Sequence, residues 1–138
     1  MTGRCGSTIN VSARSWSIVR SSPSASERFL AISPNNKIPA IVDTATGMSL
    51  MESGAILIYL AKRSGRLLPA EGPEHYRVLE WLMMQMGSVG PMLGQTHHFR
   101  RFAKEKLPYA IQRYEKENAR IYGVLDRRLA ERDWLADD

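Results

Sequence analysis

The pattern of apolar and polar residues in the first half of the chain predicts a strand hairpin. Residues 40–42 form a short, wholly apolar run, which is typical of a buried strand. Residues 43–47 have the Thr, Ala and Gly composition of a hairpin loop, and residues 48–51 are predicted to return as a second strand.

An amphipathic helix is predicted to follow this hairpin directly, over residues 52–64. The helix is predicted to end near Ser64-Gly65, and the basic residues near that end suit the negative end of the helix dipole. The apolar positions recur with helical spacing and form one stripe: Ile56, Leu57, Tyr59 and Leu60.

The second half of the chain predicts two long helices after a linker over residues 67–73. The first helix is expected over residues 74–102. Residues 87–91 are expected to bend or break it, because Pro91 removes a backbone donor and clashes with the preceding turn. The second helix is expected over residues 108–130, with apolar positions at helical spacing: Ile111, Tyr114, Ile121, Tyr122, Leu125 and Leu129.

Residues 1–28 differ in composition from the rest, because serine and arginine are abundant and Glu27 is the one acid. Residues 9–11 and 16–19 resemble strands only weakly. Three interpretations stay open for this segment: an organelle transit peptide, a poorly ordered tail, or a disrupted gene start in place of a regular first strand and helix. We favour the third.

The overall composition narrows the functional classes. The chain has 138 residues, of which 43% are hydrophobic, and no apolar run is long enough to span a membrane. Cys5 is the single cysteine, so the chain has no internal disulfide or CxxC pair and suits a reducing compartment. The three histidines do not form a credible metal cluster. Residues 1–28 carry most of the net charge of +5, and the remainder lacks a basic, aromatic face for nucleic acid.

The candidate ligand site lies where the predicted helix begins, at Glu52-Ser53. A helix N-terminus offers unpaired N–H groups and a positive dipole to an anion. The Ser53 hydroxyl can add a donor, and the Glu52 carboxylate can hold a cation, so a head group with an amine and a carboxylate on one carbon would satisfy both. The alternative stays open that Ser53 only caps the helix and Glu52 only favours its dipole.

The run S-P-N-N-K-I-P-A-I-V-D, followed by E-S-G-A-I-L-I-Y-L-A, resembles the glutathione-binding half of a cytosolic glutathione transferase. The resemblance implies an α/β plus all-α fold. Residues 28–68 would form a partial thioredoxin-like domain and residues 74–138 a truncated helical domain, after an atypical segment over residues 1–27.

The same resemblance implies how glutathione binds. Pro39 would be cis, and the backbone of Ile38 would pair with the cysteinyl part of glutathione. Glu52 and Ser53 would hold the γ-glutamyl amine and carboxylate. The residue that activates the glutathione thiol would belong to the opening strand and helix, and it stays unassigned.

Two further runs, MGSVGPMLGQTHHF and LPYAIQRYEKENARIYGVL, resemble the bacterial Nu class, whose members act as glutathione-dependent disulfide oxidoreductases or peroxidases. This resemblance is expected to cover residues 28–136 and implies a glutathione contact from an arginine on the second long helix. Arg120 is the best match and Arg113 the second choice. Arg120 has an equal alternative as a surface ion pair with Glu117.

The resemblance also implies the partners of the intact protein. These are glutathione as co-substrate, a small electrophile, peroxide or disulfide, and a second copy in a cytoplasmic homodimer. From the composition, we expect no metal, membrane or nucleic-acid partner. We expect a fragment that lacks both ends of the family fold. Two alternatives are a transferase-like binding or regulatory module without catalysis, and an inactive truncated product.

Overall fold

The computed structural model describes residues 16–18 and 26–136 of the chain. Two units divide between Leu68 and Pro69, and each is described by itself. The first unit contains strands and helices, and the elements described in the second unit are all helical. The elements of the first unit are β1 (Trp16–Ile18), α1 (Ser26–Ile32), β2 (Ala40–Asp43), β3 (Ser49–Met51) and α2 (Ser53–Ser64).

The first unit is built on a three-stranded sheet in the order β1-β2-β3. Strands β2 and β3 pair antiparallel, with Ala40 opposite Met51. The loop between them closes on Asp43, whose backbone carbonyl accepts a hydrogen bond of 2.7 Å from the Gly47 N–H. Gly47 has a φ of 74°, which glycine adopts without steric cost. The predicted hairpin is confirmed, and its strands differ from the prediction by one residue.

One of the two weakly strand-like runs in the N-terminal segment forms a strand, β1. Residues 16–18 pair antiparallel with β2, with Trp16 opposite Asp43 and Ile18 opposite Ile41. A three-residue strand shows little periodicity of its own, and it becomes recognisable only through its partner strand. The other strand-like run, residues 9–11, lies outside the described residues.

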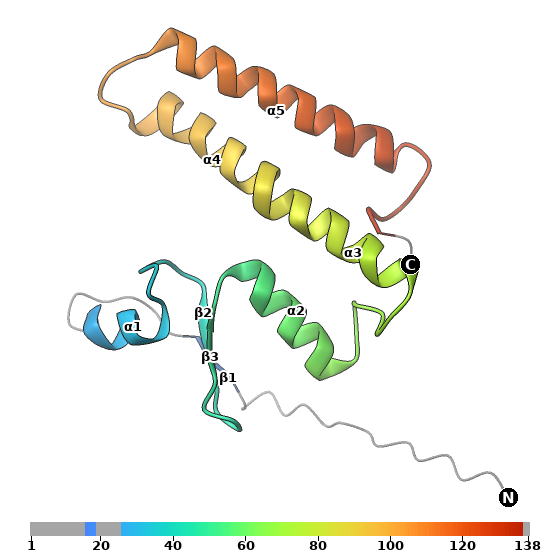
Figure 1. Cartoon of the computed structure of the whole chain (residues 1–138). Coiled ribbons are helices and arrows are strands. Elements are labelled where there is room, and N and C mark those ends of the chain that lie inside the picture. The colour runs from blue at the N-terminus through green and yellow to red at the C-terminus, as the bar shows by residue number, and fades with distance from the viewer. Residues whose placement is uncertain (1–15, 19–25, 137–138) are drawn as a thin grey trace, which may run out of the picture. The chain divides into compact units, whose positions relative to one another are not determined.

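Helices α1 and α2 cover the sheet of the first unit, and both contact β2 and β3. They lie on either side of the strands (Figure 1). The helices contribute Phe29 and Ile56 to the core, where they are 0% and 6% exposed, and β2 contributes Ala40 and Ile41. Leu57 was expected in the same apolar stripe as Ile56 but is 55% exposed. The stripe of α2 is therefore narrower than its sequence predicts.

Helix α2 ends as expected. Gly65 takes the left-handed conformation with a φ of 65°, and its N–H bonds to the carbonyl of Ala61. This arrangement is a common way to satisfy the last carbonyls of a helix, and glycine is favoured there because it lacks a Cβ.

The second unit is a hairpin of long helical segments. The first arm consists of α3 (Pro73–Met84), a π-helical turn η2 (Gln85–Val89), α4 (Gly90–His97) and a second π-helical turn η3 (His98–Phe102). The second arm is α5 (Pro108–Leu129), which runs back along the first (Figure 1). The predicted helix over residues 108–130 is confirmed to within one residue.

Of the bend or break expected near Pro91, the structure shows no break but a change of helical register. In the turn before Pro91, the Gly90 N–H bonds to the carbonyl of Gln85, five residues earlier, and the backbone of Gly90 stays helical. Pro91 then falls in the first turn of α4, where a proline needs no backbone donor. The wider turn thus accommodates Pro91 without ending the helix.

Contacts between α4 and α5 form the centre of the second unit. Ile121 is 0% exposed, and the Asn118 amide donates a hydrogen bond of 2.7 Å to the Thr96 hydroxyl. The rings of Phe99 and Tyr114 are stacked, with centroids 5.5 Å apart. Tyr122 was predicted on the apolar face of α5 but is 57% exposed.

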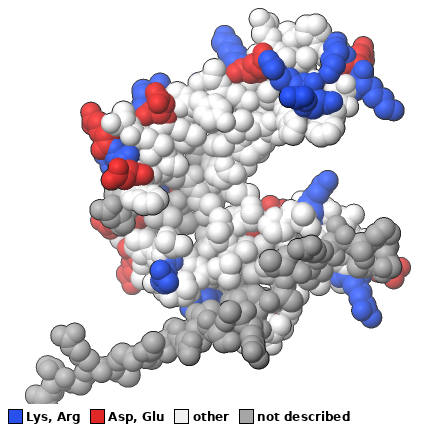
Figure 2. Space-filling model, turned by 180° about the vertical axis from the view of Figure 1, so that it is seen from behind, with Lys and Arg blue, Asp and Glu red and all other residues white. Residues whose placement is uncertain are grey.

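Within residues 16–18 and 26–136, no helix is both long enough and apolar enough to cross a membrane. On the face shown in Figure 2, acidic side chains lie among the lysines and arginines, with uncharged surface between them.

Candidate ligand-binding site

The hairpin brings the two halves of the predicted site together within the first unit. Because Ala40 pairs with Met51, the residues just before β2 and just after β3 leave the sheet at the same end. Ile38 and Pro39 therefore lie beside Glu52 and Ser53, although the two pairs are separated in the sequence. This arrangement gathers four of the five predicted site residues.

The Ile38-Pro39 peptide bond is cis, as the resemblance implied. Ile38 is 67% exposed, so the turn is open to a ligand. The buried Ser33 supports this turn, because its hydroxyl donates a hydrogen bond of 2.9 Å to the carbonyl of Lys37. Ser33 was not predicted as a site residue, because a serine in a polar turn gives no sign of its burial.

Glu52 occupies the N-cap position of α2 in an unusual backbone conformation. Its φ of 70° and ψ of 116° lie in a region that residues other than glycine rarely adopt. Such a conformation persists only when the surrounding structure enforces it, and it is often associated with function. The Glu52 side chain does not cap the helix. Instead, its Oε1 accepts a hydrogen bond of 3.2 Å from the Asn35 amide, which links the helix start to the turn before Pro39.

The alternative in which Ser53 caps the helix is wrong, because Ser53 does not occupy the N-cap position. Ser53 is the first residue of α2, and Glu52 is the N-cap residue. The half-buried Ser53 hydroxyl thus lies at the positive end of the helix dipole, next to the backbone N–H groups of the first turn. An anion placed there would meet several donors at once, and the Glu52 carboxylate beside it suits an amine.

Arg120, the fifth predicted residue, lies on α5 in the second unit and forms a bidentate ion pair with Glu117. Its Nε is 2.9 Å from Glu117 Oε2, and its Nη2 is 2.6 Å from Oε1. These hydrogen bonds hold the pKa of Glu117 below its usual value and raise the pKa of Arg120. The ion pair expected as the alternative role of Arg120 is present.

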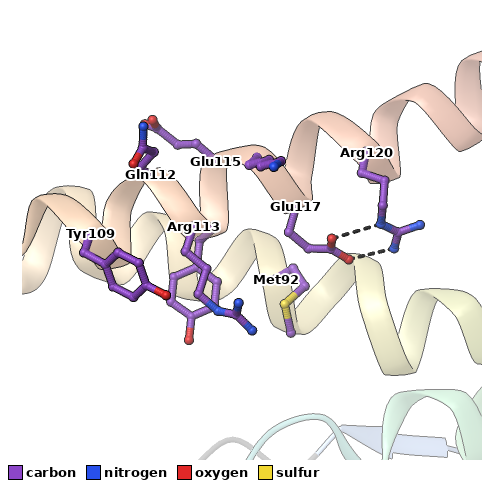
Figure 3. Close-up of a pocket in the computed structure, with 9 residues that line it drawn as sticks. Met92, Tyr109, Gln112, Arg113, Glu115, Glu117 and Arg120 are labelled. Carbon is purple, nitrogen blue, oxygen red and sulfur yellow. Dashed lines mark hydrogen bonds and ion pairs between the residues drawn. The ribbon is translucent and has the colours of Figure 1, made fainter.

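Arg113, the second choice, shares a groove with Arg120 on the surface of α4 and α5 (Figure 3). The groove has a volume of about 1170 Å³, and Glu117 lies between the two arginines along α5. Apolar and aromatic side chains, including Met92 and Tyr109, line it as well. Among the residues that the structure describes, no group of three or more His, Cys, Asp or Glu side chains is placed to hold a metal ion.

Asp43 is a buried acid that was not predicted as a functional residue. Its side chain is 0% exposed, and its Oδ2 accepts a hydrogen bond of 2.6 Å from the Tyr59 hydroxyl of α2. Its Oδ1 accepts a hydrogen bond of 2.9 Å from the Ala45 N–H, and the Arg63 guanidinium lies 3.7 Å from Oδ2. The sequence does place this acid directly after a wholly apolar strand, which is a signal of burial. Residues 43–47 were assigned to a hairpin loop, so the burial of Asp43 was not predicted.

This network makes the stability of the first unit depend on pH. The hydrogen bond from Tyr59 lowers the pKa of Asp43, and the same bond raises the pKa of Tyr59. The Asp43 contribution is therefore present above the unfolded-state pKa of about 4 and is lost as the pH falls through the lower folded-state value. The Tyr59 contribution is present below about pH 10 and is lost as the pH rises through the higher folded-state value.

We expect Asp43→Asn to flatten the acid side of this profile. The measurement is the urea midpoint as the pH is lowered from neutrality, for the unaltered chain and for the variant. Asp126→Asn, at an exposed acid of α5, is the control and should keep the original slope. Parallel profiles for the unaltered chain and Asp43→Asn would contradict the assignment.

Comparison with known proteins shows which class of protein this chain resembles. Residues 12–62 match the N-terminal domain of glutathione S-transferase. Over about 80% of its length, the chain is similar to members of the glutathione S-transferase family. The match begins well before Arg28, where we expected the resemblance to start, so that boundary was wrong. It includes β1, which the sequence pattern alone indicated only weakly.

Among individual proteins, the chain is similar to the disulfide-bond oxidoreductase YfcG of Escherichia coli. The two are 51% identical over 115 residues, which is 80% of this chain and 54% of YfcG. A glutathione transferase of Pseudomonas putida, solved with one glutathione disulfide per subunit, superposes with a TM-score of 0.77 at 46% identity. That match covers 85% of this chain and 52% of the other.

A family member from Pseudomonas fluorescens, solved with two glutathione molecules bound, gives a TM-score of 0.75 at 46% identity. The match covers 80% of this chain and 52% of the solved chain. The present chain thus spans about half the length of the proteins that it resembles here.

Proposed function

We propose that this chain binds glutathione across the Ile38-Pro39 turn and the start of α2. The observation that carries the proposal is the antiparallel pairing of Ala40 with Met51, which places the turn beside Glu52 and Ser53. The backbone of Ile38 would pair with the cysteinyl part of the ligand. The Glu52 carboxylate would hold the γ-glutamyl amine, and Ser53 with the first N–H groups of α2 would hold the γ-glutamyl carboxylate.

Bound in this way, glutathione supplies the reactive sulfur. Its thiolate would attack one sulfur of a disulfide substrate, so that a mixed disulfide forms and the other sulfur leaves as a thiolate. Peroxides and electrophilic carbons are alternative acceptors of the same nucleophile. A disulfide is favoured because YfcG is a disulfide-bond oxidoreductase and the Pseudomonas putida relative holds glutathione disulfide. The residue that activates the thiol stays unassigned.

The proposal extends to Arg120 as the partner of the glycine carboxylate of glutathione. A guanidinium matches a carboxylate bidentately, and Arg120 already binds the Glu117 carboxylate in this geometry. In the glutathione complex, the glycine carboxylate would take the place of Glu117. A homodimer and a cytoplasmic location, implied by the family resemblance, complete the proposal.

Titration of the full chain with glutathione tests the binding proposal. We expect saturable binding that S-methylation of glutathione does not abolish, because the anchoring groups lie away from the sulfur. A chain that is folded by circular dichroism but does not bind glutathione would refute the proposed function. Binding without turnover of a glutathione-containing mixed disulfide would instead identify the chain as a binding module.

The same titration distinguishes the two arginines when the ligand is shortened. Arg120→Ala should weaken binding of glutathione but leave binding of γ-glutamylcysteine, which lacks the glycine carboxylate, almost unchanged. Arg113→Ala is the matched control from the same helix face. A larger selective loss for Arg113→Ala would transfer the role to that residue.

A further inference from the structure

A buried hydrogen bond joins the two elements that carry the two halves of the site. Asp43 is the last residue of β2, the strand that follows Pro39, and Tyr59 lies in α2, the helix that follows Glu52. The bond between their side chains is 2.6 Å long, and the Asp43 side chain is fully buried. A buried carboxylate is costly unless donors satisfy it, so Asp43 holds its partners in a defined position.

The beginning of α2 needs support of this kind from elsewhere in the unit. The Glu52 side chain makes no capping hydrogen bond, and its backbone φ of 70° is unfavourable for a residue with a Cβ. The Asn35–Glu52 hydrogen bond lies at the exposed surface, where water competes with it. The buried contacts of α2 further along the helix are therefore better suited to fix where its first turn lies.

Tyr59 lies on the buried side of α2. It follows Ile56 by three residues, which places both side chains on the same helical face, and Ile56 is 6% exposed. Arg63, one turn later, reaches the same carboxylate at 3.7 Å. Two successive turns of α2 thus contact one carboxylate at the end of β2, and this limits sliding or rotation of the helix over the sheet.

We propose that Tyr59 is a positioning residue of the glutathione site. Through Asp43 it holds the first turn of α2 at the distance from the Ile38-Pro39 turn that lets one ligand occupy both halves. This inference rests on the proposed function and adds to it a residue that does not contact the ligand. Its distinguishing consequence is that Tyr59 affects binding by way of Ser53.

A double-mutant cycle measures this dependence. Glutathione is titrated into the full chain and into Tyr59→Phe, Ser53→Ala and the double variant. We expect Tyr59→Phe to weaken binding by about threefold to tenfold, within the range seen for coupled neighbours. The double variant should lose clearly less than the product of the two single losses, because a misplaced Ser53 has less binding left to lose. Tyr122→Phe, at an exposed tyrosine of α5, is the control and should bind normally.

The design separates positioning from stability. Thermal unfolding without ligand gives the temperature range in which each variant is fully folded, and all titrations are made within it. Arg63→Gln removes the outer contact of the network and should give a smaller loss that is coupled to Ser53 in the same way. If Tyr59→Phe does not fold, Arg63→Gln tests the positioning role in its place.

Unchanged affinity in Tyr59→Phe, or losses that multiply independently in the double variant, would overturn the positioning role while leaving glutathione binding intact. Failure of the folded, unaltered chain to bind glutathione would overturn the proposed function and this inference together. The two failures are therefore distinguishable in one set of titrations.

Discussion

Phe29→Ala is expected to lower the free energy of unfolding of the first unit by about 3–5 kcal/mol, the usual cost of truncating a buried phenylalanine. Phe29 is 0% exposed, and α1 packs through it against the sheet. Since whole domains are stable by only about 5–15 kcal/mol, the loss removes a large share of the total. The measurement is urea unfolding followed by circular dichroism.

Leu30→Ala is the matched control, because Leu30 is the next residue of α1 and is 41% exposed. Its cost should be about 1 kcal/mol or less, as for most partly exposed positions. Equal losses for the two variants would show that α1 does not pack through Phe29.

Phe29→Ala should also affect the ligand site, because α1 leads directly into the turn before Pro39. The Phe29 carbonyl accepts a hydrogen bond of 2.7 Å from the Ser33 N–H, and the Ser33 hydroxyl in turn holds the carbonyl of Lys37. Loss of packing at Phe29 would therefore loosen the support of the Ile38-Pro39 turn.

Ser53→Ala is expected to weaken glutathione binding by about 10-fold to 150-fold, which corresponds to the loss of one charge-assisted hydrogen bond worth about 1.5–3 kcal/mol. The proposed γ-glutamyl carboxylate would lose the hydroxyl donor but keep the backbone N–H groups of the first turn of α2. Retention on immobilised glutathione, followed by elution with free glutathione, gives a first result, and calorimetric titration gives the affinity.

Ser64→Ala is the control from the opposite end of the same helix. The Ser64 hydroxyl bonds to the carbonyl of Ala61, so its removal tests whether any change to α2 affects binding. We expect normal retention. If the folded Ser53→Ala variant binds glutathione as well as the unaltered chain does, the γ-glutamyl site has been placed wrongly.

The sequence predicted the elements with strong local signals. Helix α5 has long apolar periodicity and Pro108 at its start, and α2 has a clear end at Gly65, so both were placed to within one residue. The hairpin was predicted because a wholly apolar run adjoins a loop of turn-forming residues. The residues proposed to bind glutathione were chosen by resemblance, since Glu52-Ser53 alone is equally compatible with a simple helix start.

Other features had a weak local signal or none. Strand β1 has three residues and is defined by its pairing with β2. The change of register before Pro91 depends on how the backbone can accommodate a missing donor. Pro91 shows where in the sequence a backbone donor is missing. The choice between a break and a π-helical turn depends on the packing of the two arms.

By itself, the sequence determined which segments become strands and helices in residues 40–129, because hydrophobic periodicity and turn-forming residues act over short distances along the chain. Only the tertiary structure decided which distant residues meet. It placed Tyr59 against Asp43, joined Asn35 to Glu52, and gave Glu52 a positive φ. These features follow from pairing and burial between segments far apart in the sequence. There, the Asp43 carboxylate, which was expected in a loop, becomes a buried acceptor, and its donor Tyr59 comes from another element.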